Sequence, residues 1–173
     1  MLKWLAATVA LAVVAVGLWA FEPWRLFTSS EIDEPPPTSA VAASADPTTG
    51  AGPSTPVRSD RVLARGDFED AEHGTSGRAL VLELGDGRRF VRLEDLATSD
   101  GPDLHVWVTD RPSGGGWSSY DDGRYVKLGE LKATHGNQNY EIPSDADLAG
   151  LRSVVIWCDR FNVAFGTAPI RLS

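Results

Sequence analysis

The chain has 173 residues, of which 42% are hydrophobic and 23% are charged, a composition that is ordinary for a globular domain. Its 16 Lys and Arg against 24 Asp and Glu give a formal net charge of −8, which is the wrong sign for a phosphate backbone and excludes nucleic acid as an expected partner. A single cysteine excludes an intramolecular disulfide framework, a CxxC zinc ribbon and a CxxCH haem attachment.

Residues 1–27 contain an uncharged apolar stretch at residues 5–21. About 20 apolar residues cross a bilayer, and Trp4 and Trp24 would place an aromatic ring at each interface. The sequence therefore predicts a transmembrane helix or signal anchor, with a cleavable signal peptide as the alternative. Lys3 precedes the stretch and favours a single-pass orientation at the cell membrane, with the C-terminal part outside the cytoplasm.

Residues 28–60 are rich in Pro, Ser, Thr and Ala, and include three consecutive prolines at 35–37. Such a composition buries too little apolar surface to offset the entropy of the chain. We expect a disordered linker that holds the following domain away from the membrane.

Residues 61–173 alternate short apolar segments with turn signals, and no helical period persists. The pattern predicts an all-β domain, an antiparallel β-sandwich of about eight strands. Asp86-Gly87 indicates a hairpin, while residues 94–97 and 145–149 are expected to form helical turns. The predicted strands lie at residues 62–68, 79–84, 90–93, 104–109, 125–128, 139–142, 153–158 and 170–172.

Residues 153–166 begin with the longest apolar run outside the N-terminus. Val154, Ile156 and Cys158 alternate onto one face, and the residues between them are apolar too, so we predict a central strand buried on both sides. Cys158 is followed by two charged residues, which places it near a strand end where a ligand could reach it.

Cys158 has two interpretations. It is either a reactive thiolate or soft ligand for iron or copper, or a small apolar residue of the core; an intermolecular disulfide is a further possibility. His73 lies in a turn, and if it folded toward Cys158 the pair could bind a metal or haem iron; otherwise it is a solvated loop residue. His105 gives less indication of a ligand than His73.

The loop at residues 110–124 is long and rich in glycine, and such loops often serve a site. Trp117 and Tyr120 lie within it, where they could stack on a sugar or a planar cofactor. The alternative is that the loop folds back and buries both rings. The acidic turn at residues 100–103 lacks the spacing of a calcium loop, and turn chemistry accounts for it.

Four phrases follow one another in an order and spacing that resemble the DM-thirteen family, also called the electron-transfer DM-thirteen family. Phe68, His73 and Gly77 fit the opening phrase of that family, so the resemblance extends over residues 62–172, although Ala133 stands where its glycine is expected. The phrases are GPDL at 101–104, LGELK at 128–132, GNQNYEIP at 136–143 and VIWCDRFNVAFGTA at 155–168.

The resemblance implies a jelly-roll or DOMON-like β-sandwich outside the cytoplasm, comparable to domains that bind haem or sugars. It also implies a redox or electron-transfer role centred on Cys158, either as a bare thiol or as a ligand to a prosthetic group. The expected cofactor is therefore haem or none. A redox partner protein is expected as well. The alternative is a non-catalytic module on a stalk that binds a sugar or a cell-surface partner. No set of acid, base and nucleophile is visible, so we do not expect an enzyme by itself.

Overall fold

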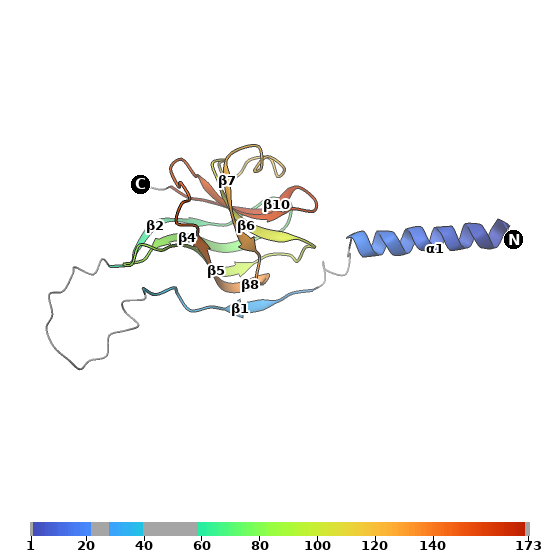
Figure 1. Cartoon of the computed structure of the whole chain (residues 1–173), viewed down its shortest axis with the longest axis horizontal. Helices are drawn as coiled ribbons and strands as arrows, with labels where there is room; N and C mark the ends of the chain where they lie inside the picture. The colour runs from blue at the N-terminus through green and yellow to red at the C-terminus, as the bar shows by residue number, and fades with distance from the viewer. Residues whose placement is uncertain (1, 22–27, 40–58, 172–173) are drawn as a thin grey trace.

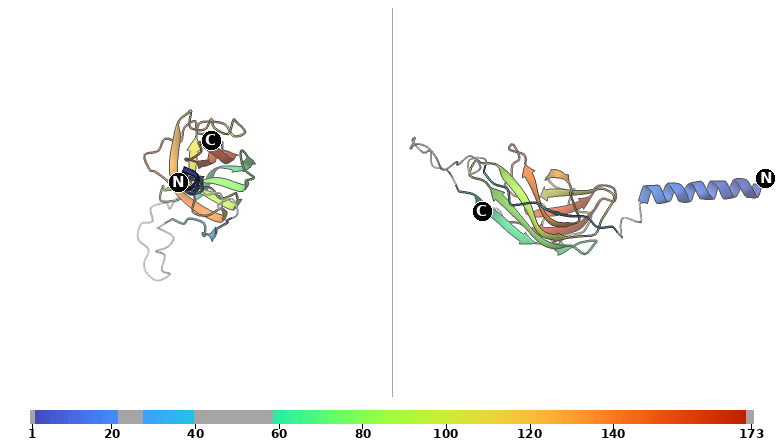
Figure 2. Two further views of the ribbon diagram at one scale, coloured as in Figure 1. Left: turned by 90° about the vertical axis from the view of Figure 1, so that its right-hand side faces the viewer. Right: turned by 90° about the horizontal axis from the view of Figure 1, so that it is seen from below.

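The protein is described by a computed structural model that covers residues 2–21, 28–39 and 59–171. Its strands form two five-stranded sheets packed face to face, and one N-terminal helix stands apart from them (Figure 1; Figure 2). The all-β sandwich predicted from the sequence is confirmed. The elements are α1 (Leu2–Phe21), β1 (Glu31–Asp33), β2 (Arg61–Asp67), β3 (Glu69–Asp70), β4 (Ser76–Glu83), β5 (Arg89–Ala97), β6 (Leu104–Thr109), β7 (Tyr125–Glu130), β8 (His135–Ile142), β9 (Ser153–Cys158) and β10 (Val163–Pro169).

The first sheet has the strand order β1-β8-β5-β4-β2, and the second has the order β3-β10-β9-β6-β7. The described strand pairs are antiparallel, except that β1 pairs with β8 in parallel. The predicted hairpin at Asp86-Gly87 joins β4 to β5, and Gly87 has the positive φ of 90° that such a turn favours.

Strand β9 is the centre of the second sheet, and all six of its residues are buried. Its inner face packs into the main core between the sheets, through Val154, Ile156 and Cys158. Its outer face belongs to a second apolar cluster on the far side of the same sheet, so a sandwich strand is buried on both faces, as predicted. That second cluster consists of Trp107, Tyr120, Val155, Trp157 and Ala164.

Three local predictions differ from the structure. Residues 94–97 form no helical turn, because β5 continues to Ala97 through an irregularity at which Asp95 adopts a φ of 50° and pairing resumes at Leu96. The last described strand is β10, which follows a tight turn closed by the bond from the Asn162 N–H to the Cys158 carbonyl; of the strand predicted at residues 170–172, residues 170 and 171 are not in a strand, and residue 172 lies outside the described residues. Residues 145–149 form turns without a helix.

The segment at residues 28–39 also differs from expectation, because it was predicted to be disordered linker. Residues 31–33 instead form β1 along the edge of β8, where Glu31 faces His135 and Asp33 faces Asn137. Polar contacts fix the strand in place: Lys132 Nζ lies 2.8 Å from Glu34 Oε1. The remaining linker, residues 40–58, lies outside the described residues.

Helix α1 covers the apolar stretch that the sequence singled out. Among the residues that the structure describes, no helix combines the length and the apolar character needed to cross a membrane, so the predicted transmembrane helix is not supported.

Candidate functional site

Cys158 is the last residue of β9 and has no exposed surface. It lies opposite Leu104 of β6. Burial raises the pKa of its thiol above the ordinary value, and the charge of Asp103 adds to this, although the backbone N–H groups of Phe161, Arg160 and Asp103 act to lower it. The residue is therefore a protonated thiol at neutral pH, and the fold gives a second chain no access with which to form a disulfide.

His73 lies in the turn after β3, and its ring packs on Phe165 with the centroids 4.2 Å apart. A haem needs an axial ligand with an open face and a cavity for the macrocycle. Cys158 is sealed in the core, and neither it nor His73 lines any of the four main cavities of the described residues. These two residues do not fit a haem.

The loop at residues 110–124 folds back over the outer face of the second sheet. Tyr120 is 0% exposed, and its hydroxyl accepts a hydrogen bond of 3.0 Å from the Gly115 N–H. Trp117 keeps 50% of its surface exposed, while its carbonyl accepts a 2.7 Å bond from the Ala164 N–H of β10. The burial alternative is therefore correct for Tyr120, which cannot stack on a ligand. Trp117 remains available to one.

Three aromatic rings stack across the outer face of the second sheet. Trp107 of β6 lies parallel to Tyr125 of β7, with the ring centroids 4.3 Å apart, and 4.9 Å from the ring of Trp157 of β9. Strand alternation places all three on this face, and Lys127 Nζ lies 4.7 Å above the Trp107 ring. Because Tyr125 is 38% exposed, the stack leads from the surface to the strand that carries Cys158.

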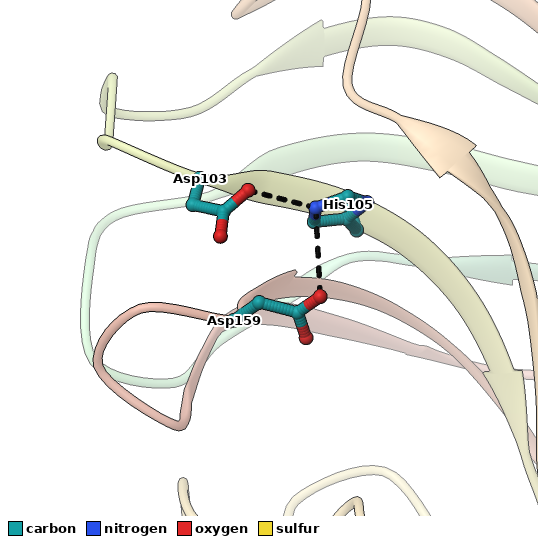
Figure 3. Close-up of side chains that lie close together, drawn as sticks. All are labelled: Asp103, His105 and Asp159. Atoms are coloured by element: carbon teal, nitrogen blue, oxygen red, sulfur yellow. Dashed lines mark hydrogen bonds and ion pairs between the residues drawn. The ribbon is translucent and has the colours of Figure 1, made fainter.

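A group of polar side chains lies beside this stack, at the end of the sheet where Cys158 is found (Figure 3). His105 Nε2 is 2.9 Å from Asp103 Oδ1 and 3.5 Å from Asp159 Oδ2. Lys127 Nζ is 2.9 Å from that same Asp159 oxygen. Asp103, His105 and Asp159 form the single group of at least three metal-ligating side chains that converge within the described part of the chain.

Sequence reasoning missed this group. Asp103 immediately precedes β6 and His105 is the second residue of that strand, so extended backbone places the two side chains on one face, and that spacing was a usable signal. Asp159 joins them because β9 pairs with β6 so that Cys158 lies opposite Leu104. This register depends on the folded sheet and is not visible in the sequence.

Comparison with known proteins gives one match. The model of the Electron transfer DM13 family matches residues 67–170, more than half of the chain. No curated protein and no solved structure matches. The matched segment runs from the last residue of β2 to the residue after β10, and it contains Cys158, the aromatic stack and the Asp103–His105–Asp159 group. The resemblance inferred from the sequence is confirmed, and the chain belongs to the Electron transfer DM13 family.

Proposed function

We propose that the chain passes single electrons to or from a redox partner protein, with Cys158 as its redox residue. The observation that carries the proposal is the setting of the Cys158 sulfur, which is fully buried, and whose raised thiol pKa is set first by burial and is lowered in part by nearby backbone N–H groups. Reactions that transfer groups to sulfur require contact with it, whereas an electron passes through packed protein: when an oxidised partner takes one electron from the neutral thiol, the S–H proton is released to solvent and a thiyl radical remains, and an electron from a reduced partner together with a proton restores the thiol. Burial therefore favours electron transfer over thiol–disulfide exchange.

The three N–H groups bring partial positive charge to the sulfur. In iron–sulfur proteins, hydrogen bonds to sulfur are one of the factors that set the reduction potential. The N–H groups of Phe161, Arg160 and Asp103 act in the same electrostatic sense on Cys158. Since two of these donors belong to the turn after β9 and one precedes β6, the fold of the second sheet holds the sulfur in this environment.

The stack of Tyr125, Trp107 and Trp157 supplies a route for the electron. Aromatic rings are the side chains that most readily accept or lose an electron, and these three follow one another at centroid distances of 4.3 and 4.9 Å. Trp157 is the neighbour of Cys158 on β9, and Tyr125 reaches the surface. A partner would therefore dock over Tyr125.

The test is a stopped-flow oxidation of the protein by an inorganic outer-sphere oxidant, which removes one electron without forming a bond to the protein. The wild type should give up one more electron than Cys158→Ser, and Trp107→Leu should slow that step while leaving its stoichiometry unchanged. Trp117→Leu removes an exposed indole outside the stack and serves as the control. Equal numbers of electrons from the wild type and Cys158→Ser, both folded by circular dichroism, would refute the proposal.

We further propose that α1 attaches the chain to the cell membrane, with the sandwich outside the cytoplasm. The support is the exposure of its apolar side chains, among them Leu11 and Val13, which pack on neither sheet. Exposed apolar surface of this extent marks an interaction with a membrane or a partner. Membrane fractionation of the full chain and of a variant lacking residues 2–21 tests this; equal amounts in the soluble fraction would exclude attachment through α1.

A second candidate function is a binding module for a sugar or a cell-surface partner. The observation that favours it is Trp117, whose indole is half exposed while its carbonyl is bonded to β10. A rigidly held, exposed aromatic ring is suited to stacking on a sugar face. Glycan-array binding that is lost in Trp117→Ala and retained in Cys158→Ser would support this function; binding unaffected by Trp117→Ala would remove it.

A further inference from the structure

The Asp103–His105–Asp159 group has the composition of a metal site. An imidazole nitrogen suits Zn²⁺, Cu²⁺, Fe²⁺ and Ni²⁺, and carboxylate oxygens suit Mn²⁺ and similar ions. All three side chains are half-buried, so water can occupy further coordination positions. The ligand atoms come from the residue before β6, from the second residue of β6 and from the residue after β9, and these two strands are neighbours in the sheet.

The distances between these atoms agree with ligands around one ion. First-row divalent ions bind nitrogen and carboxylate oxygen at about 2.0–2.2 Å, which separates neighbouring ligand atoms by roughly 3.0–3.5 Å. His105 Nε2 lies 2.9 Å from the Asp103 oxygen and 3.5 Å from the Asp159 oxygen. The second distance is long for an N–H···O hydrogen bond, so His105 holds only Asp103 by a hydrogen bond, and Asp159 is held beside it by the ion pair with Lys127.

The charges around the group also favour a cation. Glu130 of β7 pairs with His105 in the sheet and lines the same cavity as Asp103, so it adds negative charge near the group without being one of the three converging ligands. Lys127 is the basic side chain within ion-pair distance of the group, through Asp159. The cavity that Asp103 and Glu130 line has a volume of about 280 Å³, so the Asp103 carboxylate borders a space that solvent can occupy.

Lys127 already places a positive charge on the ligand that a metal would use. Its Nζ lies 2.9 Å from Asp159 Oδ2, and it also rests over the Trp107 ring. The lysine stem is flexible, so the ammonium can leave Asp159 and remain over the ring. An arriving ion therefore competes with a cation that belongs to the chain itself.

We propose that Asp103, His105 and Asp159 bind a first-row divalent transition-metal ion through one nitrogen and two oxygens, and that Lys127 lowers the affinity by competing for Asp159. This goes beyond the proposed function, because binding of the ion requires no electron transfer and does not involve Cys158, whose side chain lies on the opposite face of β9.

Calorimetric titration of the full chain with Zn²⁺ tests the site. The wild type should bind one ion; His105→Gln and Asp159→Asn should lose that binding, and Lys127→Met should bind about tenfold more tightly because one repelling charge is removed. His135→Gln, which alters a histidine of the other sheet, should bind like the wild type. The proposal is overturned if the wild type shows no saturable binding or if His105→Gln retains it, and the role of Lys127 is overturned if Lys127→Met binds like the wild type.

A spectroscopic measurement makes the test independent of affinity. Cu²⁺ bound at the site should show hyperfine coupling to a single imidazole nitrogen in electron paramagnetic resonance, and should quench the fluorescence of Trp157, which lies opposite His105 in the sheet. Both signals should vanish in His105→Gln while the circular dichroism spectrum is preserved. Retention of the nitrogen coupling in that folded variant would place the ion elsewhere.

Discussion

Tyr120 and Trp117 lie three residues apart in one loop, and the structure gives them opposite roles. Tyr120 is sealed against the outer face of the second sheet, while half of Trp117 is exposed. Removal of a fully buried aromatic side chain costs about 3–5 kcal/mol of unfolding free energy through lost burial and the cavity left behind. Substitutions on the surface usually change it by less than about 0.5 kcal/mol. Tyr120→Ala should therefore be much less stable than Trp117→Ala.

Urea denaturation followed by circular dichroism measures the difference. With an m-value of about 1–3 kcal/mol per M, Tyr120→Ala should lower the midpoint by at least about 1 M, whereas Trp117→Ala should leave it nearly unchanged. Tyr120→Phe keeps the ring and loses only the acceptor for the Gly115 N–H, so it should cost about 0.5–1.5 kcal/mol. Equal midpoints for Tyr120→Ala and Trp117→Ala would refute the placement of the loop.

Two further predictions concern β1 and Cys158. A Cβ at Gly136 would collide with the Ile32 carbonyl oxygen of β1, and φ at this glycine is +97°. Gly136→Ala should therefore release β1 and abolish the hydrogen-exchange protection of the amides of residues 31–33. Unchanged protection would contradict the pairing of β1 with β8. Because burial raises the pKa of the Cys158 thiol, the unfolded chain loses that proton first, and the stabilisation present below about pH 9 is lost as the pH rises through the folded-state pKa. Urea midpoints between pH 8 and 10.5 should therefore fall more steeply for the wild type than for Cys158→Ala, and parallel curves would show that the thiol is not desolvated.

Local patterns in the sequence carried the prediction of a central strand in the second sheet and of a hairpin in the first. The alternation in β9 predicted a strand buried on both faces, and Asp86-Gly87 predicted the hairpin between β4 and β5, because each signal depends on neighbouring residues only. The strand β1 was missed because its attachment to β8 rests on backbone pairing and polar contacts such as that of Lys132 with Glu34. A segment rich in proline carries no apolar pattern that would reveal it.

The candidate site was predicted only in part for a related reason. Cys158 was placed correctly at the end of a central strand, but its complete burial depends on the turn that follows and on β6, which the sequence does not place beside it. His73 was considered as its partner, whereas the structure packs the His73 ring on Phe165. The polar group beside Cys158 required the register of β6 against β9, which brings Asp159 to His105 from more than fifty positions along the chain.

The parallel pairing of β1 with β8 has a mechanical consequence. Strand β1 runs parallel to β8, so tension that reaches β1 from its N-terminal end acts along the axis of the strand. Its hydrogen bonds to β8, including those from the His135 N–H to the Ser30 carbonyl and from the Glu34 N–H to the Asn137 carbonyl, lie across that direction and are loaded together in shear. Hydrogen bonds loaded in shear must break together and not one at a time. A force applied at the N-terminal end of β1 is therefore borne by the β1–β8 pairing before it loads the core of the sandwich.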